Sequence, residues 1–217
     1  MFSIIYRKIE YFINTHKITQ INNDDKNRDL GIFFTSKFRF NKHIQKISLK
    51  ANRICFVLIK SLKSYDPAFL IEAFNVYVRS ILEFGSPVWN SLNKNNIKQL
   101  EDIQKRYLRS IYKRINKVNT QDIPSYKILL EYFKVESLES RRIKADLKFF
   151  HQHIFGKIKL KHNNSYSFRL TKTRGEKYKI QSSHCSTMIR YNSFFIRTAR
   201  IYSRIPIQIR KYTASVL

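Results

Sequence analysis

Three amphipathic helical patterns follow one another between Phe40 and Tyr112, and they constrain the fold more than any other feature of the chain. In each pattern apolar residues recur at three- and four-residue spacing, which places them in one stripe along a helix. The pair Asp66-Pro67, typical of a helix start, opens the second pattern. Because the breaks between the patterns are short, the sequence predicts a small three-helix bundle. The three apolar stripes are Ile44, Ile47, Ala51, Ile54 and Leu58; Leu70, Ala73, Phe74, Tyr77, Val78, Ile81 and Leu82; and Ile97, Leu100, Ile103, Tyr107, Leu108 and Ile111.

A short β-hairpin or strand element is expected before the bundle, in residues 1–36. Residues 1–20 favour extended structure with a turn at Asn14-Thr15-His16, and residues 22–29 have the composition of a polar loop. The run from Leu30 to Phe34 is short and apolar, which is typical of a strand. The glycine inside this run marks a bend or a close approach to another backbone.

The C-terminal part of the chain predicts a smaller helical region. Three helices are expected there, each opened by a serine, at 125–133, 137 to about 155, and 193 to about 203. Residues 156–190 are basic and poor in large aliphatic residues, which indicates a long loop or a weak hairpin. The expected fold is therefore mainly α, with a bundle at 37–116 and a helical region at 117–217.

The chain is strongly basic, with 42 Lys and Arg against 15 Asp and Glu and a net charge of +27. Such an excess repels itself in the folded state and is typical of proteins that meet a polyanion. The basic residues form stripes of their own on the predicted helices. Because phosphate contacts need charge and reach without base specificity, these stripes predict nucleic-acid binding. The candidate residues are Lys46, Lys50, Arg53, Lys98, Lys105, Arg106, Arg109 and Lys113, with a second group at Arg141, Arg142, Lys144 and Lys148.

Nothing in the sequence favours catalysis, a metal or a cofactor. Asp24-Asp25 is a carboxylate pair of the kind that can hold Mg²⁺, but its Asn and Lys neighbours are typical of a turn. Cys55 and Cys185 define neither a disulfide framework nor a zinc ligand set, and the 4 glycines form no phosphate-binding loop. We therefore expect no catalytic residue, no metal, no cofactor and no small-molecule substrate.

No apolar run approaches the roughly 20 residues that cross a bilayer. The basic and aromatic N-terminus contains Glu10 and lacks the Ser- and Arg-rich composition of a transit peptide. The expected location is intracellular, in the nucleus or cytoplasm, and neither secreted nor transmembrane, with no membrane partner.

Several longer motifs stand out along the chain: Leu30-Gly31-Ile32; Phe40-Asn41-Lys42-His43-Ile44; residues 77–89, Tyr-Val-Arg-Ser-Ile-Leu-Glu-Phe-Gly-Ser-Pro-Val-Trp; residues 100–106, Leu-Glu-Asp-Ile-Gln-Lys-Arg; and segments at 138–147, 173–175 and 192–200. Together they resemble the region after the palm in reverse transcriptases of non-LTR, LINE-type retrotransposons. That family typically has Lys-Asp-Leu-Gly-Val/Ile, Phe-x-x-His-Ile, Val-Arg-Pro-Ile-Leu-Glu-Tyr-Ala/Gly-Ser-Pro-Val-Trp and Leu-Glu-x-Val-Gln-Lys/Arg-Arg. The resemblance covers roughly residues 28–206.

The resemblance implies a specific set of roles. Leu30, Gly31 and Ile32 would lie at a primer-grip-like element at the end of a palm, and 37–116 would form a thumb that holds a template–primer duplex by its phosphates. The family's catalytic Phe-Ala-Asp-Asp motif lies well upstream of its Leu-Gly-Val element, and the residues before Leu30 contain no such motif. We therefore expect a non-catalytic fragment of an RNA-directed DNA polymerase. Its partners would be RNA, DNA or hybrid duplex, with a separate palm-containing chain as a candidate protein partner.

Other interpretations stay open. Heavy use of Ile, Asn, Lys and Tyr is typical of AT-rich coding DNA, and Tyr202-Ser203 stands where the family usually has Trp-Asn. Both features favour a degenerate product with no selected function. A generic basic RNA-binding protein is a further alternative, and a peripheral membrane protein is suggested by charge alone.

Overall fold

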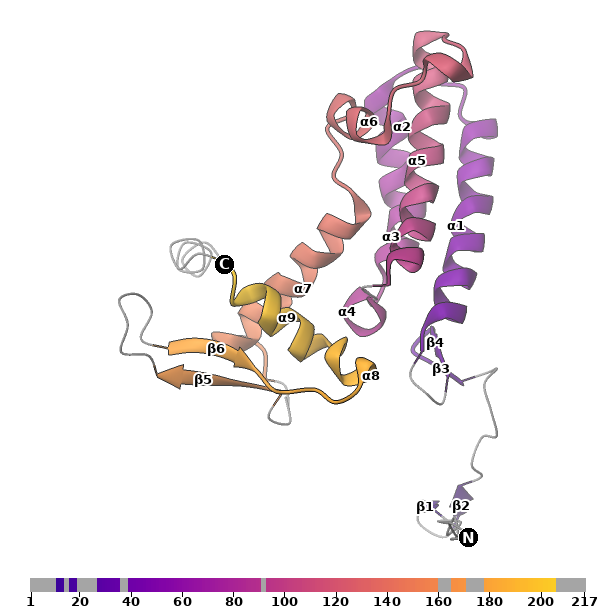
Figure 1. Cartoon of the computed structure of the whole chain (residues 1–217). Helices are drawn as coiled ribbons and strands as arrows, with labels where there is room; N and C mark the ends of the chain where they lie inside the picture. Colours follow the sequence, from indigo (N-terminus) through magenta and orange to yellow (C-terminus); the bar gives the residue numbers. More distant parts are fainter. Residues whose placement is uncertain are drawn as a thin grey trace, which may run out of the picture.

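The computed structural model of the chain describes residues 11–13, 16–18, 27–35, 39–90, 93–159, 165–170 and 178–205. Most of the described chain is helical, which confirms the predicted mainly α class. Figure 1 shows a helical bundle, with the small hairpin of residues 27–34 at the start of its first helix and a C-terminal region joined to it through α7 (Leu138–Ile154).

Three long helical segments form the bundle. They are α1 (Asn41–Ser61), the continuous run α2 (Pro67–Phe74), η1 (Asn75–Arg79) and α3 (Ser80–Glu83), and α5 (Lys94–Asn116). The Asp66 carboxylate caps α2 by accepting hydrogen bonds from the two amides at Ala68 and Phe69, which confirms the predicted helix start. A short helix, α4 (Ser86–Trp89), follows the second segment.

The helices α1 and α5 run parallel and side by side. Near their starts, Asn96 Nδ2 donates to Asn41 Oδ1 at 3.0 Å, and near their ends Arg114 donates to the carbonyls of Ile59 and Leu62. The segment from α2 to α3 runs in the opposite direction against both of them (Figure 1). This arrangement leaves one side of α1 and one side of α5 facing outward.

Most residues of the predicted apolar stripes form the bundle core, but Tyr77, Ile81 and Ile97 do not belong to it. Ile44, Leu70, Leu82, Leu108 and Ile111 are all fully buried. Tyr77, predicted on the inner stripe of the second helix, is 58% exposed instead, while Val78 is buried. The reason is that residues 75–79 form a π-helical turn, which holds more residues than an α-helical turn and shifts the helical register.

Two antiparallel hairpins precede α1. The first pairs β1 (Tyr11–Ile13) with β2 (His16–Ile18), and the second pairs β3 (Asn27–Asp29) with β4 (Ile32–Phe34). The sequence predicted a polar loop up to residue 29 and a strand from Leu30. In the structure β3 occupies the end of that loop, and Leu30 and Gly31 form the turn with φ of +45° and +86°. Positive φ at both central residues is typical of the type I′ turn, one of the two common two-residue hairpin turns.

The C-terminal region contains α6 (Tyr126–Tyr132), α7 (Leu138–Ile154), α8 (Met188–Tyr191) and α9 (Phe194–Tyr202), with a short 3₁₀ turn, η2 (Thr120–Asp122), before them. Ser137 Oγ accepts a hydrogen bond from the Ser140 amide at 3.2 Å, which confirms the predicted cap of α7. The weak hairpin expected within 156–190 is present as β5 (Tyr166–Leu170) paired with β6 (Tyr178–Ser182). A second small core, formed by Phe150, Tyr166, Ile180, Ala199 and Tyr202, holds this hairpin to α7 and α9.

The β3–β4 hairpin meets the bundle at His43. The His43 ring is 2% exposed, its Nδ1 accepts from the Phe33 amide at 3.5 Å, and its centroid lies 5.3 Å from the Trp89 ring. Burial lowers the pKa of His43 below its usual value, so this side chain is neutral in the folded protein at neutral pH. The protonated ring would have to lose its water shell at this joint.

A loss of stability at acid pH is therefore expected. A group with a lowered folded-state pKa contributes stability that is complete above its unfolded pKa of about 6.5 and is lost as the pH falls below that value. Urea unfolding between pH 7.5 and 5 should show this decline, and His43→Leu should reduce it. His151 is also buried and its pKa is lowered, so a smaller decline should remain. The exposed His184 gives the control, and His184→Leu reducing the decline equally would contradict this assignment.

Candidate nucleic-acid interface

The outer side of α1 carries only basic, polar and apolar side chains, because the helix contains no acidic residue. Lys46, Lys50 and Arg53 are all exposed there, as predicted. They are spaced so that they face away from the buried stripe of Ile44, Ala51 and Leu58. The first predicted group of cations is therefore available to a ligand.

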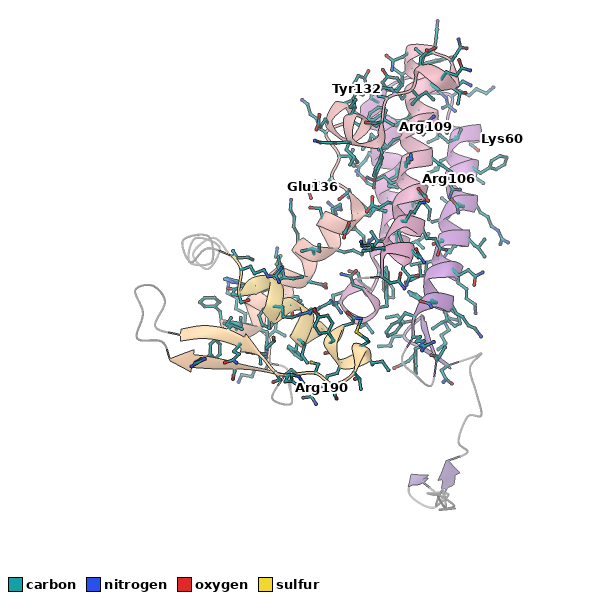
Figure 2. All side chains as sticks on the ribbon, in the orientation of Figure 1. Lys60, Arg106, Arg109, Tyr132, Glu136 and Arg190 are labelled. Carbon is teal, nitrogen blue, oxygen red and sulfur yellow. The ribbon has the colours of Figure 1, made fainter. Side chains whose placement is uncertain are left out.

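The basic residues of α5 lie beside those of α1. Arg106 is exposed and donates to Asn52 Oδ1 of α1 at 2.9 Å, which places it on the seam between the two helices. Arg109 and Lys113 reach the loop after α5, where they donate to the carbonyl and hydroxyl of Thr120 at 3.4 and 3.1 Å. Figure 2 shows Lys60 on α1 and Arg106 and Arg109 on the neighbouring α5. Lys98 is exposed, and Lys105 is half-buried.

We call this surface the α1–α5 face and define it by Lys46, Arg53, Lys60, Lys98, Lys105, Arg106, Arg109 and Lys113. Lys50 is exposed but lies at its edge. It is two positions from Asn52 in the helix, so it points nearly opposite to the seam. A ligand centred on the seam would contact Lys50 least among the predicted cations of α1.

The predicted second group on α7 is largely used within the protein. Arg141 forms a two-point ion pair with Glu83, through Nε at 2.7 Å and Nη2 at 3.1 Å, and Lys144 pairs with Glu136. Arg142 is only 1% exposed, so it is not a surface phosphate ligand, contrary to the sequence expectation. It falls on the inner stripe of α7 because it is four residues from both Leu138 and Asp146. Lys148 is exposed.

The primer-grip-like segment is divided between surface and core. Leu30 is 84% exposed at the hairpin tip, and Gly31 completes the turn, whereas Ile32 is buried against the bundle. The same hairpin adds a cation that the sequence did not suggest. Lys46 Nζ lies 3.6 Å from the centroid of the Phe33 ring, and the Arg28 guanidinium lies 5.4 Å from it. Arg28 was missed because its polar neighbours resemble a loop.

The described residues offer little for metal chemistry. Across the described ranges, no three His, Cys, Asp or Glu side chains lie close enough together to hold a metal ion. The pair Asp24-Asp25 lies outside the described residues. None of the helices in the described part of the chain is long and apolar enough to cross a membrane.

The chain is similar to an uncharacterized protein of Caenorhabditis elegans, with 33% identity over 132 residues. The match covers 61% of this chain and 65% of that relative's length. No protein-family model matches the chain. No solved structure matches it either. The description of the relative names no activity and no ligand.

Proposed function

We propose that this chain binds nucleic acid through the α1–α5 face, as a non-catalytic, thumb-like fragment of a LINE-type reverse transcriptase. The observation that carries the proposal is the separation of charge between this face and the rest of the bundle. Cations of two parallel, adjacent helices point outward together. A linear polyanion laid along the helices would contact several of them at once.

The acidic residues of the bundle support this separation because most are engaged away from the face. Glu83 pairs with Arg141 and Glu136 with Lys144. Glu101 accepts from the Tyr126 hydroxyl and from the Glu139 amide, both at 2.6 Å. Asp102, half-buried on α5, is the exception within the two helices of the face. The electrostatic potential over the α1–α5 face is therefore positive, which favours binding of an anion.

The resemblance to a reverse-transcriptase thumb supports the choice of nucleic acid among polyanions. Contacts to phosphates fix the position of a bound strand but read no sequence. We therefore expect similar affinity for different sequences of the same length and form. This chain's own side chains would hold the strand, and no described group is assigned to catalysis.

Changing Lys105, Arg106 and Arg109 together to Gln should flatten the salt dependence of binding. Each lost phosphate contact removes about 0.9 from the slope of log Kobs against log salt concentration on duplex, so the slope should fall by roughly two to three units. Fluorescence anisotropy titrations across a range of salt concentrations would measure this. The circular-dichroism spectrum should persist, because none of the three belongs to the buried stripe of α5.

A matched control removes the same charge from other surfaces. Lys127, Lys134 and Lys157 lie outside α1 and α5 and are exposed, so changing all three to Gln should leave the slope nearly unchanged. Equal slopes for the two triple variants would place the binding surface elsewhere. The proposal that the chain is non-catalytic is tested separately. Primer extension by the purified chain with Mg²⁺ or Mn²⁺ is expected to yield no product. Template-dependent synthesis by the purified chain would overturn it.

A further inference from the structure

An exposed apolar strip runs along α1 beside its seam with α5. Leu49 and Phe56 are 52% and 61% exposed and lie seven positions apart, so they occupy the same side of the helix two turns apart. Asn52, which lies between them, accepts the hydrogen bond from Arg106 of α5. Leu49 and Phe56 therefore flank the point where the two helices are joined.

Cations border this strip on both sides. On the α5 side lies Arg106, and on the far side α1 presents Lys42, Arg53 and Lys60. The Lys60 ammonium lies 5.1 Å from the centroid of the Phe56 ring, so a charge and an aromatic face are held next to each other. The two apolar side chains therefore lie between Arg106 on one side and a row of three basic residues of α1 on the other.

This pattern fits a single strand better than a duplex. In a duplex the base faces are stacked inside, so a protein meets phosphates, sugars and groove edges, and an exposed phenyl ring between cations gains little. A single strand exposes base faces, which stack on aromatic side chains while basic residues track the phosphates. Leu49 and Phe56 are about 10 Å apart along the helix axis.

The pattern fits a membrane surface less well. Helices that lie in a membrane interface bury a broad, continuous apolar face among the lipids. The continuous apolar face of α1, which includes Ile44, Ala51 and Leu58, is buried inside the bundle. The exposed apolar residues of α1 are Leu49, Phe56 and Val57, and Val57 lies about 100° round the helix from Phe56, so they form no broad continuous face.

We propose that the seam of α1 and α5 binds single-stranded nucleic acid, with Phe56 and Leu49 against base faces and Arg106 and Lys60 against phosphates on either side. The inference rests on the proposed function and narrows its ligand from any nucleic acid to an unpaired strand. It also assigns a role to exposed apolar side chains that phosphate binding alone leaves without one.

Phe56→Ala tests the assignment with four ligands of matched length: oligouridylate, oligothymidylate, a DNA duplex and an abasic deoxyribose-phosphate strand. Loss of one stacking contact should weaken binding of the two single strands about tenfold. Affinity for the duplex and the abasic strand should change by less than about twofold, and the salt slope should stay the same, because no phosphate contact is lost. Phe56→Trp should retain single-strand affinity, and its added indole fluorescence should be quenched on binding.

Phe69 provides the matched control, since it is 49% exposed on α2, outside the α1–α5 face. Phe69→Ala should leave all four affinities unchanged, and both alanine variants should keep the parent melting temperature. An equal effect of Phe56→Ala on single strand and duplex, or no effect on either, overturns the single-strand assignment. In that case the flattened slope of the Lys105, Arg106 and Arg109 variant would still support the proposed function.

Two further outcomes separate the failures. If the parent binds none of the four ligands with a salt-dependent affinity, the proposed function and this inference fall together. Flotation with vesicles of phosphatidylserine and phosphatidylcholine tests whether the strip binds lipid instead. If Phe56→Ala abolishes flotation with these vesicles but leaves oligonucleotide affinity intact, the strip faces lipid and the single-strand assignment is wrong.

Discussion

Replacing Arg197 with methionine is expected to lower the free energy of unfolding by about 3–5 kcal/mol, because it leaves a buried carboxylate without its cation. Arg197 and Asp146 are 1% and 2% exposed. Arg197 Nε and Nη2 donate to Asp146 Oδ2 at 3.2 and 3.1 Å, and Asn90 Nδ2 donates to the same oxygen at 2.8 Å. In the variant, Asn90 alone would remain as a partner for that oxygen.

Arg197 also holds two backbone segments in place. Its Nη2 donates to the Pro87 carbonyl at 2.7 Å and its Nη1 to the Asn192 carbonyl at 3.0 Å. The side chain therefore ties α9 to α4 as well as to α7. We expect hydrogen exchange in α9 to accelerate in Arg197→Met more than exchange in α1, because α1 belongs to the separate core of the bundle.

The variant should have a characteristic pH dependence. Burial raises the pKa of the Asp146 carboxyl, while the charge of Arg197 and the Asn90 hydrogen bond act to lower it. Without Arg197, burial is the dominant influence on the pKa of Asp146 and raises it further. The Asp146 carboxyl of the variant should therefore take up a proton when the chain folds. A carboxyl with a raised folded-state pKa contributes stability below its unfolded pKa of about 4, and that stability is lost as the pH rises through the folded value.

Two further variants make the test specific. The double variant Asp146→Leu with Arg197→Met should recover much of the loss, since apolar replacement of both partners removes the buried charge. Arg200→Met on the same helix is the control. Arg200 is half-buried and lies 3.4 Å from the centroid of the exposed Tyr191 ring. Replacing it should therefore lower the free energy of unfolding by only about 1 kcal/mol. Urea unfolding in which Arg197→Met is no more destabilising than Arg200→Met would contradict the network's role.

The helices of this chain are predictable from sequence because their signals are local. Apolar spacing placed α1 and α5, and the Asp66-Pro67 pair and Ser137 marked two helix starts that the structure confirms. The π-helical turn at 75–79 has no such local signal. It depends on the packing of the whole second segment, so the exposure of Tyr77 could not be predicted from spacing alone.

The candidate site is less predictable because exposure depends on tertiary contacts. Charge and spacing correctly predicted that Lys46 and Arg53 are exposed on α1. The same criterion failed for Arg142, which lies one residue from the partly exposed Arg141 but points inward. An Asp at position 146, four residues before the buried Phe150, signals a buried carboxylate that needs a partner. Only the fold identifies that partner as Arg197, 51 residues away.

Three of the segments on which the predicted reverse-transcriptase resemblance rests meet at this buried network. Pro87 and Asn90 belong to or adjoin the central block, Asp146 lies in 138–147, and Asn192 and Arg197 lie in 192–200. Their polar groups are accounted for by contacts that hold the C-terminal region to the bundle. These three segments therefore serve packing in the structure, whereas the proposed binding rests on the cations of the α1–α5 face.

Gly85→Ala is expected to destabilise the protein by about 2–4 kcal/mol at the joint between the hairpin and the bundle. Gly85 has φ of +62°, a left-handed conformation that is unfavourable for alanine by about 1 kcal/mol. A Cβ there would lie 2.8 Å from Ile32 Cδ1, and relieving that overlap adds roughly 1–3 kcal/mol because Ile32 is buried. Urea unfolding monitored by the fluorescence of Trp89, the single Trp of the chain, reports on this joint directly.

The chain contains a control that separates the two contributions. Gly156 has φ of +74° and nothing within 4 Å of its ideal Cβ, so Gly156→Ala should show the conformational penalty alone. Adding Ile32→Val to Gly85→Ala removes the overlapping Cδ1 atom, and the two substitutions should couple favourably by about 1 kcal/mol. Equal losses for the two glycine variants, together with additive behaviour at Ile32, would mean that Ile32 moves aside freely and that the hairpin is not held tightly against Gly85.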